Sequence, residues 1–474
     1  MTYKRDITRR KALQGIGGAV GAGLAVGTAA GQSGDENQGK RPIIFVHGFA
    51  GSATQFESNA MRFSSNGYPN DYLHVFEYNS LSYPANRKQV ISNLNAKIDE
   101  IISSTDADKV DAMGHSLGTD VMQRYLSNSD RASKVANYVN IDGTSGNSRP
   151  GGVRTLAIWG FGNQDANFGG DVQNVHFDNQ THVQVATSEE MFNVVYTFLT
   201  GNSPDTTKIV QEDGEITIEG RGQQFLLNQP IANTTLEIYE INPDTGERLS
   251  NLASPDVDEE GYWGPVDIPG DAYLEFVATQ TNTDQMHHFY RFPQMRSNRF
   301  VRLLSSNPGR GLDRLIRKDG NHAAFILPRD KEYWGNVEGS NDKLSVDGNN
   351  IINANTAPRG QNIIAPLAFD TFPQGRSNTN RPLGRFRVTP FLTGVDLYVP
   401  ASNPPDGSVT VEETPRDGNG LTRTMNVQNW ASDPHRITVR FPDHTQVRDD
   451  IDGGDGIDIG DGGEGNNSGL FDFL

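Results

Sequence analysis

Between residues 41 and 201, short apolar runs alternate with amphipathic stretches, and this alternation constrains the fold more than any other feature of the sequence. We expect the apolar runs to form strands over residues 42–48, 72–78, 109–114, 135–141, 153–160 and 172–178. When helices connect successive strands, the strands pair in parallel and the helices cover the faces of the sheet. The pattern therefore predicts an α/β domain with a parallel sheet flanked by helices.

Two of the intervening stretches carry clear helical signals. In residues 86–104 the apolar side chains recur at intervals of three and four, at Val90, Ile91, Leu94, Ile98, Ile101 and Ile102. Residues 187–201 begin with Thr187, a residue type that caps helix N-termini, and end on Gly201, a residue type that ends helices. We predict a helix in each stretch.

The periodicity changes after residue 203, where apolar and polar residues begin to alternate one by one. Residues 234–249 show this alternation on both sides of an Asn-Pro-Asp-Thr-Gly turn. Such segments are typical of antiparallel strands joined by hairpins. We therefore predict an α/β domain over 40–203 and an antiparallel all-β C-terminal region after it. That region divides into a β-sandwich-like module at 204–290 and a second β unit at 291–446.

The two ends of the chain differ from its body. Arg9 and Arg10 precede a weakly apolar run of Gly, Ala and Val, so we interpret residues 1–36 as a twin-arginine-type signal and leader. This signal predicts an extracellular protein, free or associated with the cell surface; the alternative is a chance Arg-Arg pair ahead of a flexible leader. Residues 447–474 are rich in Asp and Gly. We expect a flexible acidic tail there, although residues 453–458 resemble the start of a calcium-binding repeat.

Composition excludes several classes of function. The formal net charge is −18 over 474 residues, and such a charge repels nucleic acid and anionic membranes. We therefore predict no nucleic-acid partner. Because the acidic excess runs through the body of the chain, it favours a protein adapted to high salt over an ordinary acidic protein with a charged tail. Cysteine is absent, so the chain has no disulfide, no thiolate metal ligand and no cysteine nucleophile.

Residues 114–118, Gly-His-Ser-Leu-Gly, are the first candidate for chemistry. A Gly-x-Ser-x-Gly motif by itself is weak in a chain with 51 glycines. Here the motif follows an expected strand and precedes an expected helix, which is the context of a nucleophile elbow. Gly114 and Gly118 avoid clashes in that tight turn, and Ser116 becomes the candidate nucleophile.

A serine hydroxyl needs a base, and the base needs an acid that orients it. We place the base at His182, between the last expected strand and the last expected helix, and interpret His176 as a strand residue packed in the interior. The residues leave the acid open between Asp142 and Asp165. They slightly favour Asp165, because the loop after the penultimate strand commonly carries the acid. Asp171 is a weaker candidate, interpreted as a surface charge.

The oxyanion of an acyl-transfer intermediate needs two fixed N–H donors. We expect Leu117, which follows the nucleophile, to supply one backbone N–H, and Phe49, in the loop after the first strand, to supply the other. His47 and Gly48 precede Phe49, and we expect the His47 ring to brace this loop rather than to react.

The stretch at 51–70, which follows the same loop, fits two alternatives equally well. It is either a mobile lid or the first packed helix of the fold. Its candidate apolar lid residues are Phe56, Met61 and Phe63.

Several segments together resemble the bacterial and archaeal class 2 lipases of the α/β-hydrolase superfamily. In the first domain these are residues 45–49, 114–118, 140–143 and 174–184. Residues 234–249, 287–306 and 332–335 resemble the C-terminal β region of two-domain archaeal lipases. The resemblance implies hydrolysis of carboxylic esters, including acylglycerols, and a β region that helps to shape acyl-chain binding. It also implies that the acid stands in an Asp-Gly pair directly after the strand that follows the nucleophile helix, which selects Asp142 over Asp165.

These observations predict a secreted serine carboxylester hydrolase, a lipase or esterase that acts on acylglycerols or other fatty-acid esters through an acyl-enzyme. The predicted catalytic residues are Ser116, Asp142 and His182, and the predicted oxyanion donors are Phe49 and Leu117. We expect no metal, no organic cofactor and no obligate protein partner; the partner is a lipid or ester substrate, with transient contact at a lipid interface. The alternatives are a polyester depolymerase or amidase with the same triad, and a non-catalytic surface-binding protein.

Overall fold

The computed structural model describes residues 39–231, 233–373, 375–386, 389–444 and 446–447. The leader predicted at 1–36 lies outside the described residues, as does the tail predicted at 447–474 apart from Val447. Export, the flexible tail and the calcium-binding alternative therefore stay predictions.

The predicted parallel sheet is present. Its strands are β1 Ile43–Val46, β2 Leu73–Phe76, β3 Val110–His115, β4 Val135–Ile141, β5 Arg154–Trp159 and β6 Gln173–His176. They run in the order β2-β1-β3-β4-β5-β6, and all neighbouring pairs are parallel. The α/β part of the predicted fold class is confirmed, and each strand lies within one residue of a predicted run.

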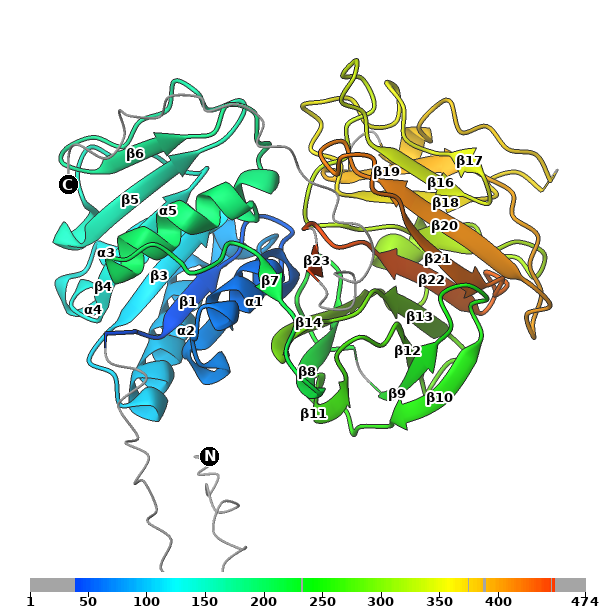
Figure 1. The fold of residues 1–474 in the computed structure, drawn as a ribbon, viewed down its shortest axis with the longest axis horizontal. Coiled ribbons are helices and arrows are strands. Elements are labelled where there is room, and N and C mark those ends of the chain that lie inside the picture. The colour runs from blue at the N-terminus through cyan, green and yellow to red at the C-terminus, as the bar shows by residue number, and fades with distance from the viewer. Residues whose placement is uncertain (1–38, 232, 374, 387–388, 445, 448–474) are drawn as a thin grey trace, which may run out of the picture. The chain divides into compact units, whose positions relative to one another are not determined.

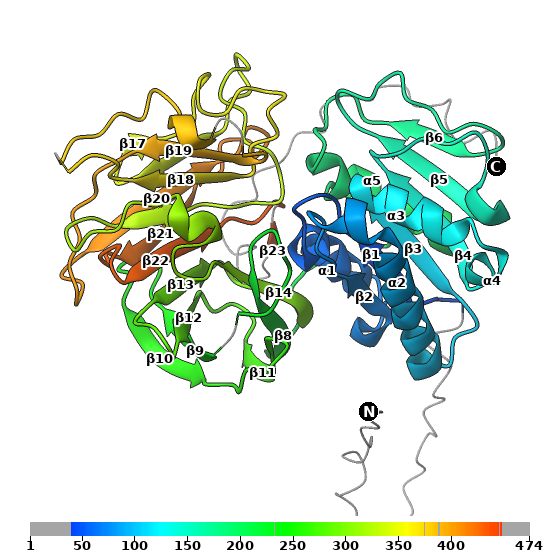
Figure 2. The ribbon, with the colours of Figure 1, turned by 180° about the vertical axis from the view of Figure 1, so that it is seen from behind.

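Helices cover both faces of this sheet. They are α1 Glu57–Ser65, α2 Tyr83–Thr105, α3 Leu117–Leu126, α4 Ser129–Ala132 and α5 Glu189–Thr200, with 3₁₀ turns at Ala53–Phe56, Asn70–Tyr72, Pro150–Gly152 and Gln184–Ala186. Ile43 and Phe45 of β1 share an apolar core with α1 and α5, whereas Ile44 and Val46 share another with α2 and α3. This division follows because successive side chains of a strand point to opposite faces. Accordingly, α5 lies in front of the sheet in Figure 1 and α3 in Figure 2.

The N-terminus of α5 differs by one residue from the prediction. Ser188, rather than Thr187, caps the helix, and its Oγ accepts a hydrogen bond from the Met191 N–H at 3.1 Å. The Thr187 hydroxyl instead donates to the carbonyl oxygen of Asp330. Gly201 ends the helix with φ 80°, as predicted. None of the helices in the described part of the chain combines the length and apolar character that a membrane span requires.

Of the two alternatives for residues 51–70, the structure shows the packed helix. Phe56 and Phe63 are fully buried, and Met61 is 6% exposed. The Phe63 ring lies 5.0 Å from the Phe192 ring in an edge-to-face contact. Phe56 and Phe63 therefore belong to the core between α1, α5 and the sheet, whereas Met61 packs in another cluster.

The remainder of the chain is all-β, which confirms the second part of the fold class. Its strands are β7 Ile209–Val210, β8 Glu215–Gln224, β9 Thr234–Ile241, β10 Arg248–Ala253, β11 Tyr262–Pro269, β12 Leu274–Gln280, β13 Met286–Arg291, β14 Asn298–Ser305, β15 Ala324–Ile326, β16 Lys343–Val346, β17 Asn349–Asn350, β18 Ala365–Phe369, β19 Leu392–Asp396, β20 Ser408–Thr414, β21 Arg423–Gln428, β22 His435–Arg440 and β23 Gln446–Val447. Short 3₁₀ turns lie at Gly311–Arg314 and Gly384–Phe386.

The sheet β17-β16-β20-β21 is purely antiparallel, as expected, whereas the eight-stranded sheet and the sheet β11-β8-β14 are mixed. The eight-stranded sheet runs in the order β10-β9-β12-β13-β22-β15-β18-β19, beside sheets ordered β11-β8-β14, β17-β16-β20-β21 and β23-β7. Parallel pairs such as β13 with β22 and β14 with β8 join strands that are distant in sequence. A tight hairpin forces only its own two strands to be antiparallel, so distant strands are free to pair in either direction. The largest sheet takes strands from both 204–290 and 291–446.

The β region packs onto the α/β domain through shared apolar side chains. Phe300 of β14 lies 5.9 Å from Phe45 of β1, ring to ring, and belongs to the same core. Met61 of α1 packs with Ile209 and Met295 of the β region in a second cluster. The loops at the carboxyl ends of the parallel strands can therefore receive contacts from the β region.

Candidate active site

Ser116 occupies a sharp turn between the end of β3 and the start of α3. Its backbone has φ 53° and ψ −120°, a conformation that is rare for residues other than glycine and that stores strain. Close packing requires the flanking glycines: a Cβ on Gly118 would lie 2.2 Å from the Val46 carbonyl oxygen, and one on Gly114 would lie 2.9 Å from the Gly118 carbonyl oxygen. The segment therefore has the strand-turn-helix geometry of a nucleophile elbow.

Asp142 and His182 meet beside this turn. Asp142 directly follows β4, and His182 lies in the loop between β6 and the 3₁₀ turn Gln184–Ala186. His182 Nδ1 lies 2.6 Å from Asp142 Oδ2. Asp142 Oδ1 accepts hydrogen bonds from the Gly160 N–H at 2.8 Å and from Asn163 Nδ2 at 2.9 Å. Because Nδ1 is held by the carboxylate, Nε2 is the imidazole nitrogen left for proton transfer.

The surroundings set the charges of this pair. Burial raises the pKa of Asp142, but the hydrogen bonds and charge of His182, with the donors on Gly160 and Asn163, outweigh burial and leave it below its ordinary value. Burial lowers the pKa of His182, whereas the hydrogen bond and charge of Asp142 and the charge of Glu332 raise it, and its final value lies above the ordinary one. Near neutral pH, Asp142 is ionised and favours the tautomer with a proton on Nδ1.

The structure brings His182 together with Asp142, the acid that the family resemblance selected. Asp165, which the residues alone slightly favoured, is exposed. Asp171 is also exposed and forms an ion pair with Arg149 at 2.8 Å, as expected of a surface charge. Neither side chain is buried beside the imidazole in the manner of Asp142.

His176 corrects an expectation of the sequence analysis. It lies in a strand, as predicted, but its side chain is exposed and its Nε2 lies 2.8 Å from the Ala166 carbonyl oxygen. The reason is topological, since β6 is the edge strand of the parallel sheet and, among the described residues, pairs with β5 alone. A histidine at an edge strand need not enter the core.

The two predicted oxyanion donors belong to the nucleophile turn and to the loop after β1. Leu117 is the first residue of α3, so its N–H has no acceptor within the helix. Phe49 lies in the loop after β1 and lines the same cavity as Ser116 and His182. Their role as donors remains a prediction.

His47 braces the loop that carries Phe49. Its Nδ1 donates to the Gly48 carbonyl oxygen at 2.8 Å, and its Nε2 accepts from Asn228 Nδ2 at 3.0 Å and from the Tyr78 N–H at 3.2 Å. The ring stacks on Tyr78 with centroids 4.5 Å apart. Burial lowers the pKa of His47, so the ring is neutral and serves as a fixed link between the loop and its surroundings.

His115, inside the elbow motif, is a second buried histidine that the sequence analysis did not assign. Its Nε2 donates to the His182 carbonyl oxygen at 2.8 Å, and its Nδ1 accepts from the Gln55 amide. Burial lowers the pKa of His115 to about 3. The neutral His115 ring therefore links Gln55 to the backbone of the loop at His182.

Ser116 and His182 line one and the same cavity. Its lining is mainly apolar and includes β-region side chains such as Phe225, Phe391 and Leu392. A second cavity shares part of this lining and reaches Phe289 and Ile326 in the β region. The residues common to both cavities are Phe225, Leu304, Pro328, Ala365, Leu392 and Arg440. The nucleophile thus faces an apolar space that continues into the β region.

Family comparison assigns this arrangement to a known class of proteins. The model of the class 2 lipases matches residues 40–139, which contain the elbow. The model of the lipase C-terminal domain matches residues 214–308, and a model of a further C-terminal domain matches residues 311–445. This chain belongs to the class 2 lipase family. It is an ester hydrolase of the lipase and esterase type.

Two solved structures illustrate how distant the structural similarities of this lipase are. Phospholipase PlaB from Legionella pneumophila, in complex with thio-NAD, matches with 10% identity and a TM-score of 0.27, over 52% of this lipase and 86% of that chain. Lipase BlEst2 from Bacillus licheniformis, in its propeptide form, matches with 13% identity and a TM-score of 0.25, over 82% of this lipase and 93% of that chain.

Sequence reasoning missed two residues that the β region contributes to the surroundings of the site. Asn228 donates to His47 across 181 positions of sequence, and Glu332 accepts from the Val183 N–H across 149 positions. Asn228 lies in a loop with no distinguishing pattern. Glu332 lies in the segment 332–335, which entered the family resemblance without a role. Within the described residues of this lipase, no group of His, Asp and Glu side chains is arranged to hold a metal ion.

Proposed function

We propose that this lipase is a serine carboxylester hydrolase that acts on fatty-acid esters, including acylglycerols, through an acyl-enzyme. The observation that carries the proposal is the strained Ser116 turn, which shares one cavity with an imidazole held by Asp142 at 2.6 Å. The match to the class 2 lipases supports ester hydrolysis as the reaction class.

The chemistry follows from the roles that this geometry allows. Ser116 Oγ attacks the ester carbonyl carbon while His182 Nε2 takes the hydroxyl proton, and ionised Asp142 stabilises the imidazolium. The backbone N–H groups of Phe49 and Leu117 receive the oxyanion. Collapse of the tetrahedral intermediate expels the alcohol, which takes its proton from His182, and leaves the acyl-enzyme. Water, deprotonated by the same imidazole, then releases the fatty acid and restores the serine.

The lining of the cavity supports an acyl chain as the recognised part of the substrate. The apolar surface beside Ser116 continues into the second cavity through Leu304 and Leu392. Burial of each methylene of an acyl chain against such a surface contributes about 0.8 kcal/mol. We therefore propose that rate and affinity rise with chain length until the apolar space is filled.

A p-nitrophenyl ester series from short to long acyl chains, measured in low and high salt, tests the proposal. We expect a preference for medium or long chains, and a fall in kcat of about 10⁴-fold or more in the Ser116→Ala variant. Full activity of Ser116→Ala would refute the serine mechanism. Turnover of anilides alone would favour an amidase, and turnover of polyhydroxyalkanoate alone would favour a polyester depolymerase.

The cellular setting is proposed from the sequence. Arg9 and Arg10 support export to an extracellular location, and the net charge of −18 supports function in high salt. We propose that the lipase acts without a cofactor or a protein partner and meets its substrate at a lipid interface. Retention of the protein in the cytoplasm after Arg9→Lys and Arg10→Lys replacement, with export of the unchanged chain, is the expected result of a fractionation experiment.

A further inference from the structure

A carboxylate from the β region holds the loop that carries His182. We propose that Glu332 is a positioning residue for His182: it restrains residues 181–184, so that the imidazole keeps its place in the cavity that it shares with Ser116. This inference rests on the proposed function, because it concerns the geometry of the proposed base.

The Glu332 carboxylate accepts three hydrogen bonds from this loop. Oε1 accepts from the Val183 N–H at 2.6 Å, and Oε2 accepts from the Gln184 N–H at 3.1 Å and from the Thr181 hydroxyl. The residue is 1% exposed, so little water is available to replace these bonds. Because the donors lie immediately before and after His182, the carboxylate restrains the backbone on both sides of the imidazole.

Glu332 is itself firmly held. Its backbone carbonyl oxygen accepts from Arg416 Nη1 at 2.6 Å and from Arg329 Nη2 at 2.7 Å. Arg329 is 1% exposed and pairs with Glu413 at 2.6 Å. Arg416 also donates to the Gln184 amide oxygen at 2.5 Å. The restraint is therefore a buried network of charge-assisted hydrogen bonds, which are shorter and stronger than neutral ones.

The loop has a second restraint on its other side. His115, in the elbow motif, donates from Nε2 to the His182 carbonyl oxygen at 2.8 Å. His115 belongs to the α/β domain and Glu332 to the β region, so the loop is held between the two. Loss of Glu332 removes every loop contact made by this carboxylate, and a shift of about 1 Å at a catalytic group can cost 10²-fold in rate.

The carboxylate also acts on His182 through its charge. The titratable and charged groups that face the imidazole or line its cavity are Asp142, His115, Glu332, Arg329, Asp330 and Arg440. Among them, Glu332 raises the pKa of His182 without a hydrogen bond to the ring. The base must be neutral to accept a proton, so loss of this charge moves the acid limb of the activity profile to lower pH.

Glu332→Gln in the full-length lipase is the primary variant. The amide keeps the length of the side chain but removes the charge and leaves one oxygen acceptor. If the amide oxygen takes the place of Oε1 opposite the Val183 N–H, an NH₂ group faces the Gln184 N–H and that hydrogen bond is lost. A merely structural role would lower the unfolding temperature and leave the kinetics of the folded protein unchanged.

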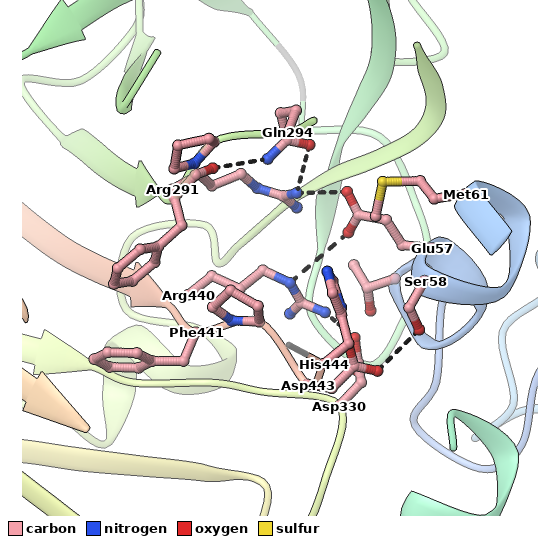
Figure 3. Close-up of a pocket in the computed structure, with 14 residues that line it drawn as sticks. Glu57, Ser58, Met61, Arg291, Gln294, Asp330, Arg440, Phe441, Asp443 and His444 are labelled. Atoms are coloured by element: carbon pink, nitrogen blue, oxygen red, sulfur yellow. Dashed lines mark hydrogen bonds and ion pairs between the residues drawn. The ribbon is translucent and has the colours of Figure 1, made fainter. Parts of the chain in front are cut away.

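Glu57→Gln is the matched control. Glu57 is also a buried carboxylate that joins the α/β domain to the β region, and it accepts from Arg291 Nη1 at 2.7 Å and from Asn298 Nδ2 at 2.6 Å. Figure 3 shows it facing Arg291 and Arg440 in a charged pocket. This pocket shares Thr54, Asp330 and Arg440 with the active-site cavity, but Ser116 and His182 do not line it. Replacement of Glu57 should lower stability while leaving the His182 loop and the kinetics unchanged.

Steady-state kinetics with a short p-nitrophenyl ester over a range of pH test whether Glu332 positions His182. For Glu332→Gln we expect kcat to fall about 10- to 100-fold with KM changed less than about twofold, together with an acid limb at lower pH. Glu57→Gln should have the same kcat, KM and acid limb as the unchanged lipase. A folded Glu332→Gln with ordinary kcat and acid limb would overturn the inference. Activity that persists in Ser116→Ala would instead overturn the proposed function.

Thr181→Val provides an independent test if Glu332→Gln does not fold. Valine has nearly the shape of threonine but removes the hydroxyl that donates to Glu332, and the carboxylate charge stays in place. We expect kcat to fall about two- to fivefold, with the acid limb unmoved. An unchanged kcat in this variant would count against positioning.

Discussion

Replacement of Asp142 by Asn is the sharpest test of the proposed acid, because the surroundings of the carboxylate determine how an amide must sit there. Asp142 Oδ1 faces two donors, the Gly160 N–H at 2.8 Å and Asn163 Nδ2 at 2.9 Å. An amide directs its oxygen to these donors, so its NH₂ group faces His182 Nδ1. The imidazole must then accept at Nδ1 and carry its proton on Nε2. In that tautomer it cannot accept the proton of Ser116.

The size of the effect follows from the two orientations of the amide. The reverse orientation sets an NH₂ group against two donors, and leaving buried donors unpaired costs about 1–3 kcal/mol each. The unproductive orientation therefore dominates. A triad histidine held in the wrong tautomer loses about 10⁴-fold in kcat, which corresponds to about 5 kcal/mol of transition-state stabilisation.

The assay compares Asp142→Asn and Asp165→Asn with the unchanged lipase, using kcat and KM for a p-nitrophenyl ester near neutral pH. Thermal unfolding confirms that each variant is folded. We expect Asp142→Asn to lose kcat at nearly constant KM, and Asp165→Asn to be fully active because its side chain is exposed. A folded and active Asp142→Asn, or an inactive Asp165→Asn, would refute the reasoning.

Three further predictions concern the elbow, the oxyanion loop and the base. Gly118→Ala places a Cβ 2.2 Å from the Val46 carbonyl oxygen, so its free energy of unfolding should fall by about 1–3 kcal/mol in chemical denaturation; an unchanged midpoint would contradict the packing. Asn228→Ala removes the donor to His47 Nε2, which should lower stability by roughly 1–3 kcal/mol and reduce kcat more than it changes KM. Because the pKa of His182 is raised from its ordinary 6.5, the acid limb of kcat/KM should lie above that pH, where the neutral base forms. The same shift favours the folded state at low pH, and this contribution is lost as pH rises through the folded pKa.

Local sequence patterns were sufficient to predict those elements whose structure depends on residues close together in the sequence. The strands of the parallel sheet, the helix at Glu57–Ser65 as one of two alternatives and the turn at Ser116 all follow from periodicity and glycine placement within short windows. His176 shows where this reasoning fails. Its strand was predicted, but whether a strand lies at the edge or the centre of a sheet depends on the order of strands in space.

The β region shows the same limit on a larger scale. Alternating residues predicted its strands, but the parallel pairing of β13 with β22 joins segments that no hairpin connects. The predicted cap of α5 was wrong by one residue, also because of a contact between residues that are distant in sequence. Thr187 is a good cap in isolation, yet its hydroxyl is engaged by the Asp330 carbonyl oxygen of the β region, and Ser188 takes the capping role.

The sequence by itself determined the fold class, the elbow at Ser116 and a short choice of partners for it, because these depend on residue types and spacing within single elements. The residues alone left the choice of aspartate open, the family resemblance selected Asp142, and the tertiary structure shows that Asp142 reaches His182. Only the tertiary structure decided what lines the cavity and which β-region residues hold the loops. Asp142 is 40 positions from His182, and Glu332 is 149 positions from Val183. Contacts over such separations exist only after the sheet and the β region have packed, so no local pattern can specify them.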